Sequence, residues 1–211
     1  MKLYDFTLAP NPRRVRMFLA EKGIEMPPTE QINTREAGQF SAEFQKVNPR
    51  GTVPALVLDD GTLLTESISI CRYFEELHPE PSLFGRDAKE KAVIDMWNRR
   101  VEIECYAPAA DVVRNSLEIF KDRAIPGMPN GVPQIAALAE RGRASVARFV
   151  GRLDQQLADN QFIAGDYLSI ADQTAFITFD FAKRGELEVP ADAKNIARWQ
   201  SEMAARPSAS A

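Results

Sequence analysis

The segment NPRGTVPALVLDDGTLLTESISI, residues Asn48–Ile70, determines how the first part of this chain folds. Two short apolar runs, Ala55–Leu58 and Thr62–Thr65, flank the turn sequence DDG at Asp59–Gly61. An Asp-Gly pair between two such runs is a strong signal for a β-hairpin. A helix is predicted directly afterwards, from Ser67 to His78. The segment therefore predicts two antiparallel strands that lead into a helix.

Two features of this segment are suited to an extended peptide ligand. Pro54 stands just before a strand, where proline removes a ladder hydrogen bond. A cis peptide between Val53 and Pro54 would bend the chain and leave the Val53 backbone free to pair with a peptide. A trans proline at a strand start is the alternative. Ser67 is predicted as a helix N-cap whose helix favours a carboxylate, and Glu66 could pair with an ammonium group. Alternatively, Ser67 only caps the helix and Glu66 is solvated.

Around this segment, residues 1–78 alternate between strand and helix patterns. In the first helix, Val15, Phe18 and Leu19 recur at the helical spacing, and Gly23 is suited to end it. The predicted order is β-α-β-α-β-β-α. The elements that precede the hairpin are expected at Lys2–Phe6, Pro12–Lys22, Thr29–Ile32 and Glu36–Val47.

Beyond a Pro- and Gly-marked linker at residues 79–86, the pattern of residues 87–211 is wholly helical. Trp97, Val101 and Cys105 recur every fourth residue and predict a buried face. Pro108 is expected to kink or divide the helix that carries them. The predicted fold class is thus α/β plus all-α. The helices are expected at Ala88–Lys121, Gln134–Asn160, Ser169–Lys183 and Ala193–Ala205.

The composition of the 211 residues indicates a soluble globular protein, with 45% hydrophobic and 27% charged residues. A formal net charge of −4 argues against a nucleic-acid partner. The chain has no run of about 18 apolar residues, so we expect no membrane span. It has two distant cysteines, Cys71 and Cys105, and one histidine, His78. We therefore expect no metal site and a cytoplasmic location.

Several of these motifs together resemble the cytosolic glutathione transferases. The resemblance rests on NPRGTVPAL, on LTES, on the order of elements, and on FIAGDYLSIADQTAF at Phe162–Phe176. In the last motif, Ser169 and Asp172 have the spacing of a helix capping box. The resemblance covers nearly the whole chain. It implies a thioredoxin-like domain, then a helical-bundle domain, and a homodimer in which the helix Ser67–His78 meets the partner's helical domain.

The resemblance also implies a set of glutathione-binding residues. Glu66 and Ser67 match the positions that hold the γ-glutamyl end of glutathione. Val53, before the matching cis-proline Pro54, is expected to pair its backbone with the cysteinyl part. Gln39 matches a polar position near the glycine carboxylate. Glutathione is the expected co-substrate, and no metal is implied.

The sequence departs from the family pattern at the residue that activates the glutathione sulfur. Ala9 stands where the serine- and cysteine-type transferases have their catalytic side chain. Asn11, in a turn that resembles the bacterial nu class, is the expected substitute, through its side chain or its backbone N–H. Arg13 and Arg14 either add positive potential at the site or lie on a solvated helix face; the solvated face is slightly favoured.

A hydrophobic electrophile is expected to bind between the two domains. Tyr106 and Arg114 are predicted to face this cleft, and Trp97 is predicted to be core. The leading function is conjugation of glutathione to hydrophobic electrophiles, a detoxification reaction. A glutathione-dependent disulfide or peroxide reductase is one alternative. A non-catalytic glutathione- or ligand-binding protein of the same fold is the other.

Overall fold

The computed structural model describes residues 1–211 and contains one four-stranded mixed sheet in the order β2-β1-β3-β4. β1 pairs parallel with β2 and antiparallel with β3, which places Leu3 opposite Leu56. β3 and β4 form the predicted hairpin. The strands are β1 (Lys2–Asp5), β2 (Thr29–Gln31), β3 (Ala55–Val57) and β4 (Leu63–Thr65).

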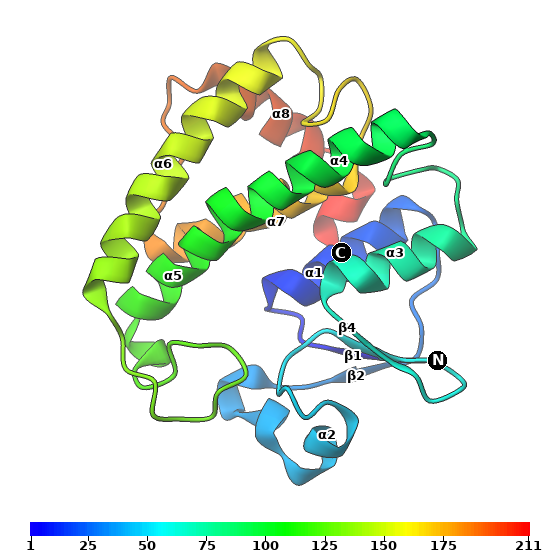
Figure 1. The fold of residues 1–211 in the computed structure, drawn as a ribbon, viewed down its shortest axis with the longest axis vertical. Coiled ribbons are helices and arrows are strands. Elements are labelled where there is room, and N and C mark those ends of the chain that lie inside the picture. The colour runs from blue at the N-terminus through cyan, green and yellow to red at the C-terminus, as the bar shows by residue number, and fades with distance from the viewer.

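Helices cover both faces of this sheet, as in a thioredoxin-like domain (Figure 1). Two of them, α1 (Pro10–Glu21) and α3 (Ser67–Leu77), pack together on the face nearer the helical domain. The short α2 (Ala42–Val47) covers the other face through Phe44, which packs on Tyr4. The predicted helix Glu36–Val47 was too long. Its first part is two 3-10 turns separated by Ala37 at φ 60°, which an α-helix cannot accommodate.

The second domain is a helical bundle that begins with α4 (Ala88–Arg100) and α5 (Ala107–Ser116). A π-helical segment, Val101–Tyr106, joins them without a break in the chain's helical course. Proline lacks an N–H and its ring crowds the carbonyl four residues earlier, so the wider π turns accommodate Pro108. The sequence analysis predicted that this helix ends at Lys121, whereas it ends at Ser116.

The remaining helices of the bundle match their predicted ranges to within two residues. The central one, α7, is buried along most of its length, and in Figure 1 it runs behind α4 and α5. The predicted capping box at its start is confirmed, since the Ser169 and Asp172 side chains each bond the other's backbone. These helices are α6 (Ala136–Ala158), α7 (Ile170–Ala182) and α8 (Lys194–Ala204).

The two domains share buried side chains at their junction. Met17 of α1 belongs to the core of the helical domain, and Ile170 of α7 belongs to the core of the first domain. A 3-10 turn at the chain end, Pro207–Ser210, packs on α1, where Ser208 donates to Glu21 at 2.6 Å. The domains are therefore joined by a shared buried interface. No helix in the structure has both the length and the apolar character needed to cross a membrane.

Candidate functional site

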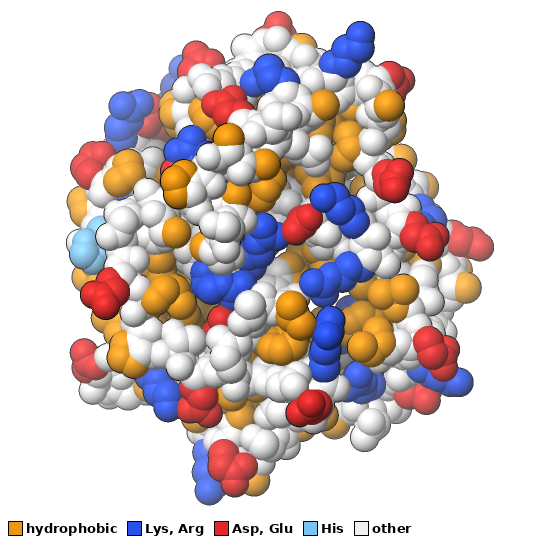
Figure 2. All heavy atoms as spheres, turned by 180° about the vertical axis from the view of Figure 1, so that it is seen from behind, with side chains coloured by type: hydrophobic (Ala, Val, Ile, Leu, Met, Phe, Trp, Pro, Cys, Tyr) orange, Lys and Arg blue, Asp and Glu red, His pale blue; other side chains and the backbone are white.

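A cavity of about 560 Å³ lies between the two domains, at the end of β1 and the start of α1. The sheet domain supplies the turn at residues 8–11 and the loop at residues 51–53. The helical domain supplies Tyr106, α5 and the loop that follows it. Figure 2 shows the face on which basic side chains gather at the middle of the molecule, where the two domains meet. Of the predicted site residues, Asn11, Gln39, Val53, Tyr106 and Arg114 line this cavity.

The start of α1 presents a single free backbone donor to the cavity. Ala9 is the N-cap, and its own N–H is bonded to the Phe6 carbonyl at 2.9 Å. Pro10 and Pro12 have no N–H, and the N–H of Arg13 already bonds Ala9. The N–H of Asn11 has no acceptor. The two prolines therefore concentrate the donor capacity of this helix end, and its positive dipole, on Asn11.

Asn11 and Tyr106 both line this cavity, one from each domain. Burial raises the pKa of Tyr106, while Arg14 and Asn11 act in the opposite direction. Tyr106 is therefore a neutral hydroxyl, able to donate one hydrogen bond, in the same cavity as Asn11. The sequence placed Tyr106 only in the electrophile half of the site. Tyr106 lies 95 positions after Asn11 in the chain. No local sequence pattern indicates that the two residues line the same cavity.

The loop before β3 offers unpaired backbone groups to the same cavity. The Val53–Pro54 peptide is cis, and neither the N–H nor the C=O of Val53 takes part in a hydrogen bond. Val53 lines the cavity, whereas Pro54 is buried behind it. Gln39 lines the cavity from the other side, and its buried Oε1 atom has no hydrogen-bond partner. These are the groups that an extended peptide would complete.

Glu66 and Ser67 stand at the start of α3, outside the lining of this cavity. The prediction that Ser67 is the N-cap was wrong, because Glu66 holds that position at φ 65° and Ser67 is the first helical residue. The N–H groups of Ser67, Ile68 and Ser69 have no acceptor, so three backbone donors are free at the helix start. The Glu66 side chain is 70% exposed, with Arg50 at 3.8 Å.

Arg14 is buried near the start of α3. The slightly favoured prediction, that Arg14 lies on a solvated helix face, was therefore wrong. Its Nη1 donates to Ser67 Oγ at 3.0 Å and to Glu102 Oε1 at 3.3 Å, and the guanidinium lies over the ring of Tyr106. Its Nε and Nη2 atoms are buried without partners. Because Arg14 occupies a lone pair of the Ser67 oxygen, the hydroxyl proton of Ser67 is left to donate outward. Arg13, also expected on that face, bonds Asp180 and the Ala209 carbonyl.

The helical side of the cavity combines apolar and basic side chains. Arg114 donates from Nε to the Ala124 carbonyl at 2.9 Å and lies over the ring of Phe120. Burial lowers the pKa of Arg114, although the group stays charged. Phe120 and Phe181 supply apolar surface on this side. The predicted pair of Tyr106 and Arg114 is therefore brought together in one cavity.

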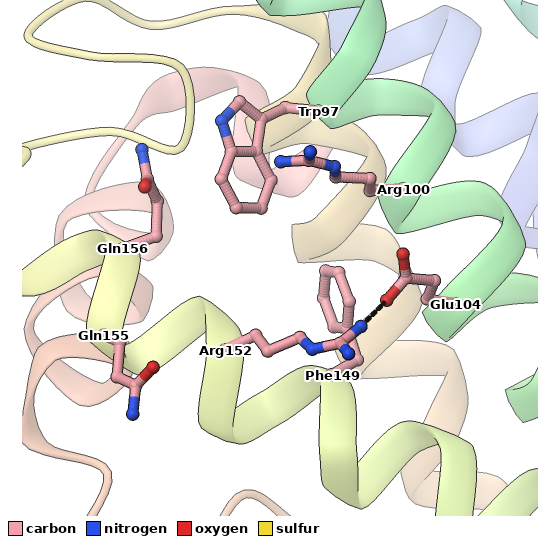
Figure 3. Close-up of a pocket in the computed structure, with 7 residues that line it drawn as sticks. All are labelled: Trp97, Arg100, Glu104, Phe149, Arg152, Gln155 and Gln156. Carbon is pink, nitrogen blue, oxygen red and sulfur yellow. Dashed lines mark hydrogen bonds and ion pairs between the residues drawn. The ribbon is translucent and has the colours of Figure 1, made fainter.

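Trp97 lies in a different pocket, between α4 and α6 (Figure 3). The side chain is half-buried and packs on both cores, so the predicted core role is only partly fulfilled. This pocket has a volume of about 480 Å³. Arg100 and Glu104 reach it from the α4 side, and Glu104 pairs with Arg152 of α6 at 2.7 Å.

Comparison with known proteins agrees with this arrangement. Residues 9–77 match the family "Glutathione S-transferase, N-terminal domain", and residues 105–207 match "Glutathione S-transferase, C-terminal domain". Glutathione S-transferase 2 of Saccharomyces cerevisiae is 34% identical over 99% of this chain and 87% of its own length. A glutathione S-transferase domain-containing protein of Marinobacter aquaeolei superposes with a TM-score of 0.90, at 31% identity over 99% of both chains.

A second solved relative extends the similarity to another bacterium. The Gtt2-class glutathione S-transferase of Vibrio parahaemolyticus is 36% identical, with a TM-score of 0.82 over 99% of this chain and 95% of its own. These similarities span both domains together with the cavity between them. The chain therefore belongs to the glutathione S-transferase family.

Proposed function

We propose that this protein conjugates reduced glutathione to electrophiles at the cavity between its domains, with Asn11 stabilising the thiolate. The observation that carries the proposal is the unpaired N–H of Asn11. Asn11 lines the same cavity as Val53, whose backbone is also unpaired. The Val53 backbone would pair with the cysteinyl residue of glutathione, and the Asn11 N–H would face its sulfur. The thiol proton leaves to solvent, the sulfur forms a bond to the electrophilic carbon, and the leaving group departs with its electron pair.

In this proposal, glutathione binds through groups that the chain otherwise leaves unpaired. The γ-glutamyl carboxylate accepts from the free N–H groups at the start of α3 and from the Ser67 hydroxyl. Glu66 neutralises the ammonium group. The Val53 N–H and C=O pair with the cysteinyl residue, and Gln39 faces the glycine end. Arg14 acts as a positioning residue, since it fixes the Ser67 oxygen without reaching the ligand.

The energies involved are sufficient for a moderate activation of the thiol. Lowering a thiol pKa from about 8.5 to about 7 requires roughly 2 kcal/mol of preferential stabilisation of the thiolate. A hydrogen bond to a charged group contributes about 1.5–3 kcal/mol, and a helix N-terminus adds about 0.3–1 kcal/mol. Asn11 supplies both, without a catalytic hydroxyl.

Replacing Asn11 with alanine tests the part of its side chain in this activation. We expect the thiolate midpoint of bound glutathione to rise by about one pH unit, because one charge-assisted hydrogen bond of about 1.5 kcal/mol is lost. The ultraviolet absorbance of the thiolate, titrated against pH, measures the shift. Asn130→Ala, on an exposed loop, is the matched control. An unchanged midpoint in Asn11→Ala would remove the side chain from this role and leave only its backbone N–H.

The chain offers no cysteine for a mixed-disulfide mechanism. Cys71 and Cys105 are buried, and burial raises the pKa of each thiol to about 12. Neither lines the cavity. A glutathione-dependent reductase would have to bind two glutathione molecules, and no observation favours this or a purely binding role. Two buried free thiols are typical of a reducing compartment, so we propose that the protein acts in the cytoplasm, in detoxification.

We also propose that the protein is a homodimer, with α3 of one subunit against the helical domain of the other. Apolar side chains of α3, α4 and the π-helical segment stand exposed: Leu77 is 50% exposed, Met96 39% and Ile103 57%. Burying them in a dimer is favourable. Ile103→Glu is expected to give a monomer in light scattering coupled to size exclusion, whereas Ile135→Glu, at a site 52% exposed in wild type, is expected to leave a dimer. A monomeric wild-type protein would contradict this.

A further inference from the structure

The charge of the cavity between the domains is opposite to that of the whole chain. Twenty-two residues line it, and none of them is Asp or Glu. The chain as a whole carries a formal net charge of −4. A cavity with basic side chains and no carboxylate holds a strong positive potential, because its walls screen the charges less than water does. The basic lining residues are Arg35, Arg114, Arg123 and Arg184.

These arginines have only neutral partners in the protein. Arg114 donates to the carbonyls of Ala124 and Arg123, while Arg123 donates to the Ile119 carbonyl at 3.0 Å. Arg184 donates to the Leu8 carbonyl at 2.9 Å. None of them forms an ion pair within the chain. Arg114 and Arg123 are half-buried, whereas Arg35 and Arg184 are exposed at the cavity mouth. Guanidinium groups that carry no counterion are available to a ligand that supplies one.

Two carboxylates of the helical domain, close in sequence to lining residues, pair with arginines outside the lining. Glu102 pairs with the buried Arg14, and Asp180 pairs with Arg13. Neither contributes to the lining of the cavity. These two carboxylates therefore do not pair with the arginines of the lining. Burial lowers the pKa of Arg114; Tyr106 acts in the opposite direction and the nearby charge of Arg123 in the same one.

The four arginines divide between the two halves of the site. Arg35 lies on the sheet domain near Gln39, where the glycine carboxylate of glutathione is proposed to bind. The other three belong to the helical domain and its loops, as do the neighbouring apolar side chains Phe120 and Phe181. This second half has no role in the binding of glutathione described above. It combines an apolar wall with three guanidinium groups.

We propose that the electrophile carries an anionic group, a carboxylate in the first instance, on an apolar or aromatic body. The inference rests on the proposed conjugation and specifies the substrate class of that same site. The aromatic body packs on Phe120 and Phe181, and the carboxylate accepts hydrogen bonds from Arg123 and Arg184. A planar guanidinium group binds a carboxylate with two parallel hydrogen bonds.

The test compares a chlorodinitrobenzoate with the neutral carboxamide of the same ring. For each compound, kcat/KM is divided by the rate constant of the uncatalysed reaction with glutathione, which removes the difference in intrinsic reactivity. We expect the carboxylate to be favoured by about tenfold or more, because a charged hydrogen bond contributes more than one factor of ten. The preference should fall in about 0.5 M NaCl, which screens the exposed part of the interaction.

Variants locate the preference in the named residues. Arg123→Gln and Arg184→Gln are each expected to lower the preference severalfold, through KM of the carboxylate, whereas Arg123→Lys keeps much of it. Arg148→Gln removes one exposed positive charge of α6, outside the cavity, and is expected to change nothing. Equal normalised rates for both compounds would overturn the inference. So would variants that change only KM for glutathione, because the arginines would then serve that ligand.

A binding measurement separates this inference from the proposed function. The dinitrobenzoate and dinitrobenzamide without the chloro group cannot react, and calorimetry with the glutathione-bound protein gives their affinities. If neither chloro compound is turned over, the proposed conjugation fails. Tighter binding of the dinitrobenzoate would still support an anion-selective cavity, and equal affinities would overturn it.

Discussion

Replacing Asp172 with alanine is expected to lower the free energy of unfolding by about 3 kcal/mol or more, because each buried donor left without an acceptor costs about 1–3 kcal/mol. The buried carboxylate accepts from the N–H of Ile163, the N–H of Ser169 and the indole Nε1 of Trp199, each at 2.9 Å. One side chain thus joins the loop before α7, the first turn of α7, and α8. Denaturant unfolding at neutral pH measures the loss.

Two further variants define what the carboxylate contributes. Asp172→Asn keeps one acceptor oxygen but turns an NH₂ group toward the remaining donors, so we expect a loss of similar size. Asp166→Asn changes an exposed aspartate without hydrogen bonds in the same loop, and an effect within about 0.5 kcal/mol is expected. A loss in Asp172→Ala no larger than that of Asp166→Asn would contradict the role assigned to the carboxylate.

Asp172 also predicts how stability depends on pH. Burial raises the pKa of Asp172 to about 6 in the folded protein, against hydrogen bonds from Ile163, Ser169 and Trp199 that act in the opposite direction. In the unfolded chain the pKa is about 3.9. Between these values the folded state binds a proton that the unfolded state does not, so the contribution of Asp172 to stability falls as pH rises from about 4 to about 6.

The difference in unfolding free energy between wild type and Asp172→Asn isolates this titration, because the other groups are common to both proteins. We expect that difference to shrink as pH rises through this window and to level off above it. A difference that grows over the same window would mean that the hydrogen bonds outweigh burial and that the folded pKa lies below the unfolded one.

The sequence predicts elements that depend on residues close together in the chain. The hairpin needs only the turn at Asp59–Gly61 and its flanking strands, and the capping box needs only Ser169 and Asp172. The split at Ala37 was missed because a residue at positive φ other than glycine has no dependable signature in sequence. The π segment was likewise missed, although Pro108 correctly indicated that the helix is irregular there.

The site was less predictable wherever its residues meet across the fold. Arg14 bonds partners that lie 53 and 88 positions away, Ser67 and Glu102. The sequence pattern of α1 alone does not distinguish this buried arginine from a solvated one. The basic lining of the cavity has the same origin, because Arg114 and Arg184 converge only when α5 and α7 cross. The family resemblance predicts which residues bind glutathione. The packing of the helices determines which side chains line the rest of the cavity.

The second large effect is expected at Glu75, where the linker joins both domains. Its Oε2 pairs with the buried Lys22 at 2.7 Å, and its Oε1 accepts from the N–H groups of Leu83 and Phe84 at 3.0 and 3.2 Å. Lys22 also donates to the Pro81 carbonyl. Removing one member of a buried ion pair leaves the other charge uncompensated, at a cost of about 3–5 kcal/mol. We expect Glu75→Gln to lower the free energy of unfolding by that amount.

The origin of this loss can be tested by removing the stranded charge as well. Glu75→Gln combined with Lys22→Met keeps an acceptor for Leu83 and Phe84 and leaves no unpaired charge, so the double variant should be more stable than Glu75→Gln alone. Glu76→Gln, on the exposed side of the same helix, is the control. If the double variant is no more stable than Glu75→Gln, the linker hydrogen bonds rather than the ion pair account for the loss. Through these bonds Glu75 ties α3 to Lys22 at the end of α1 and to the linker at Leu83 and Phe84.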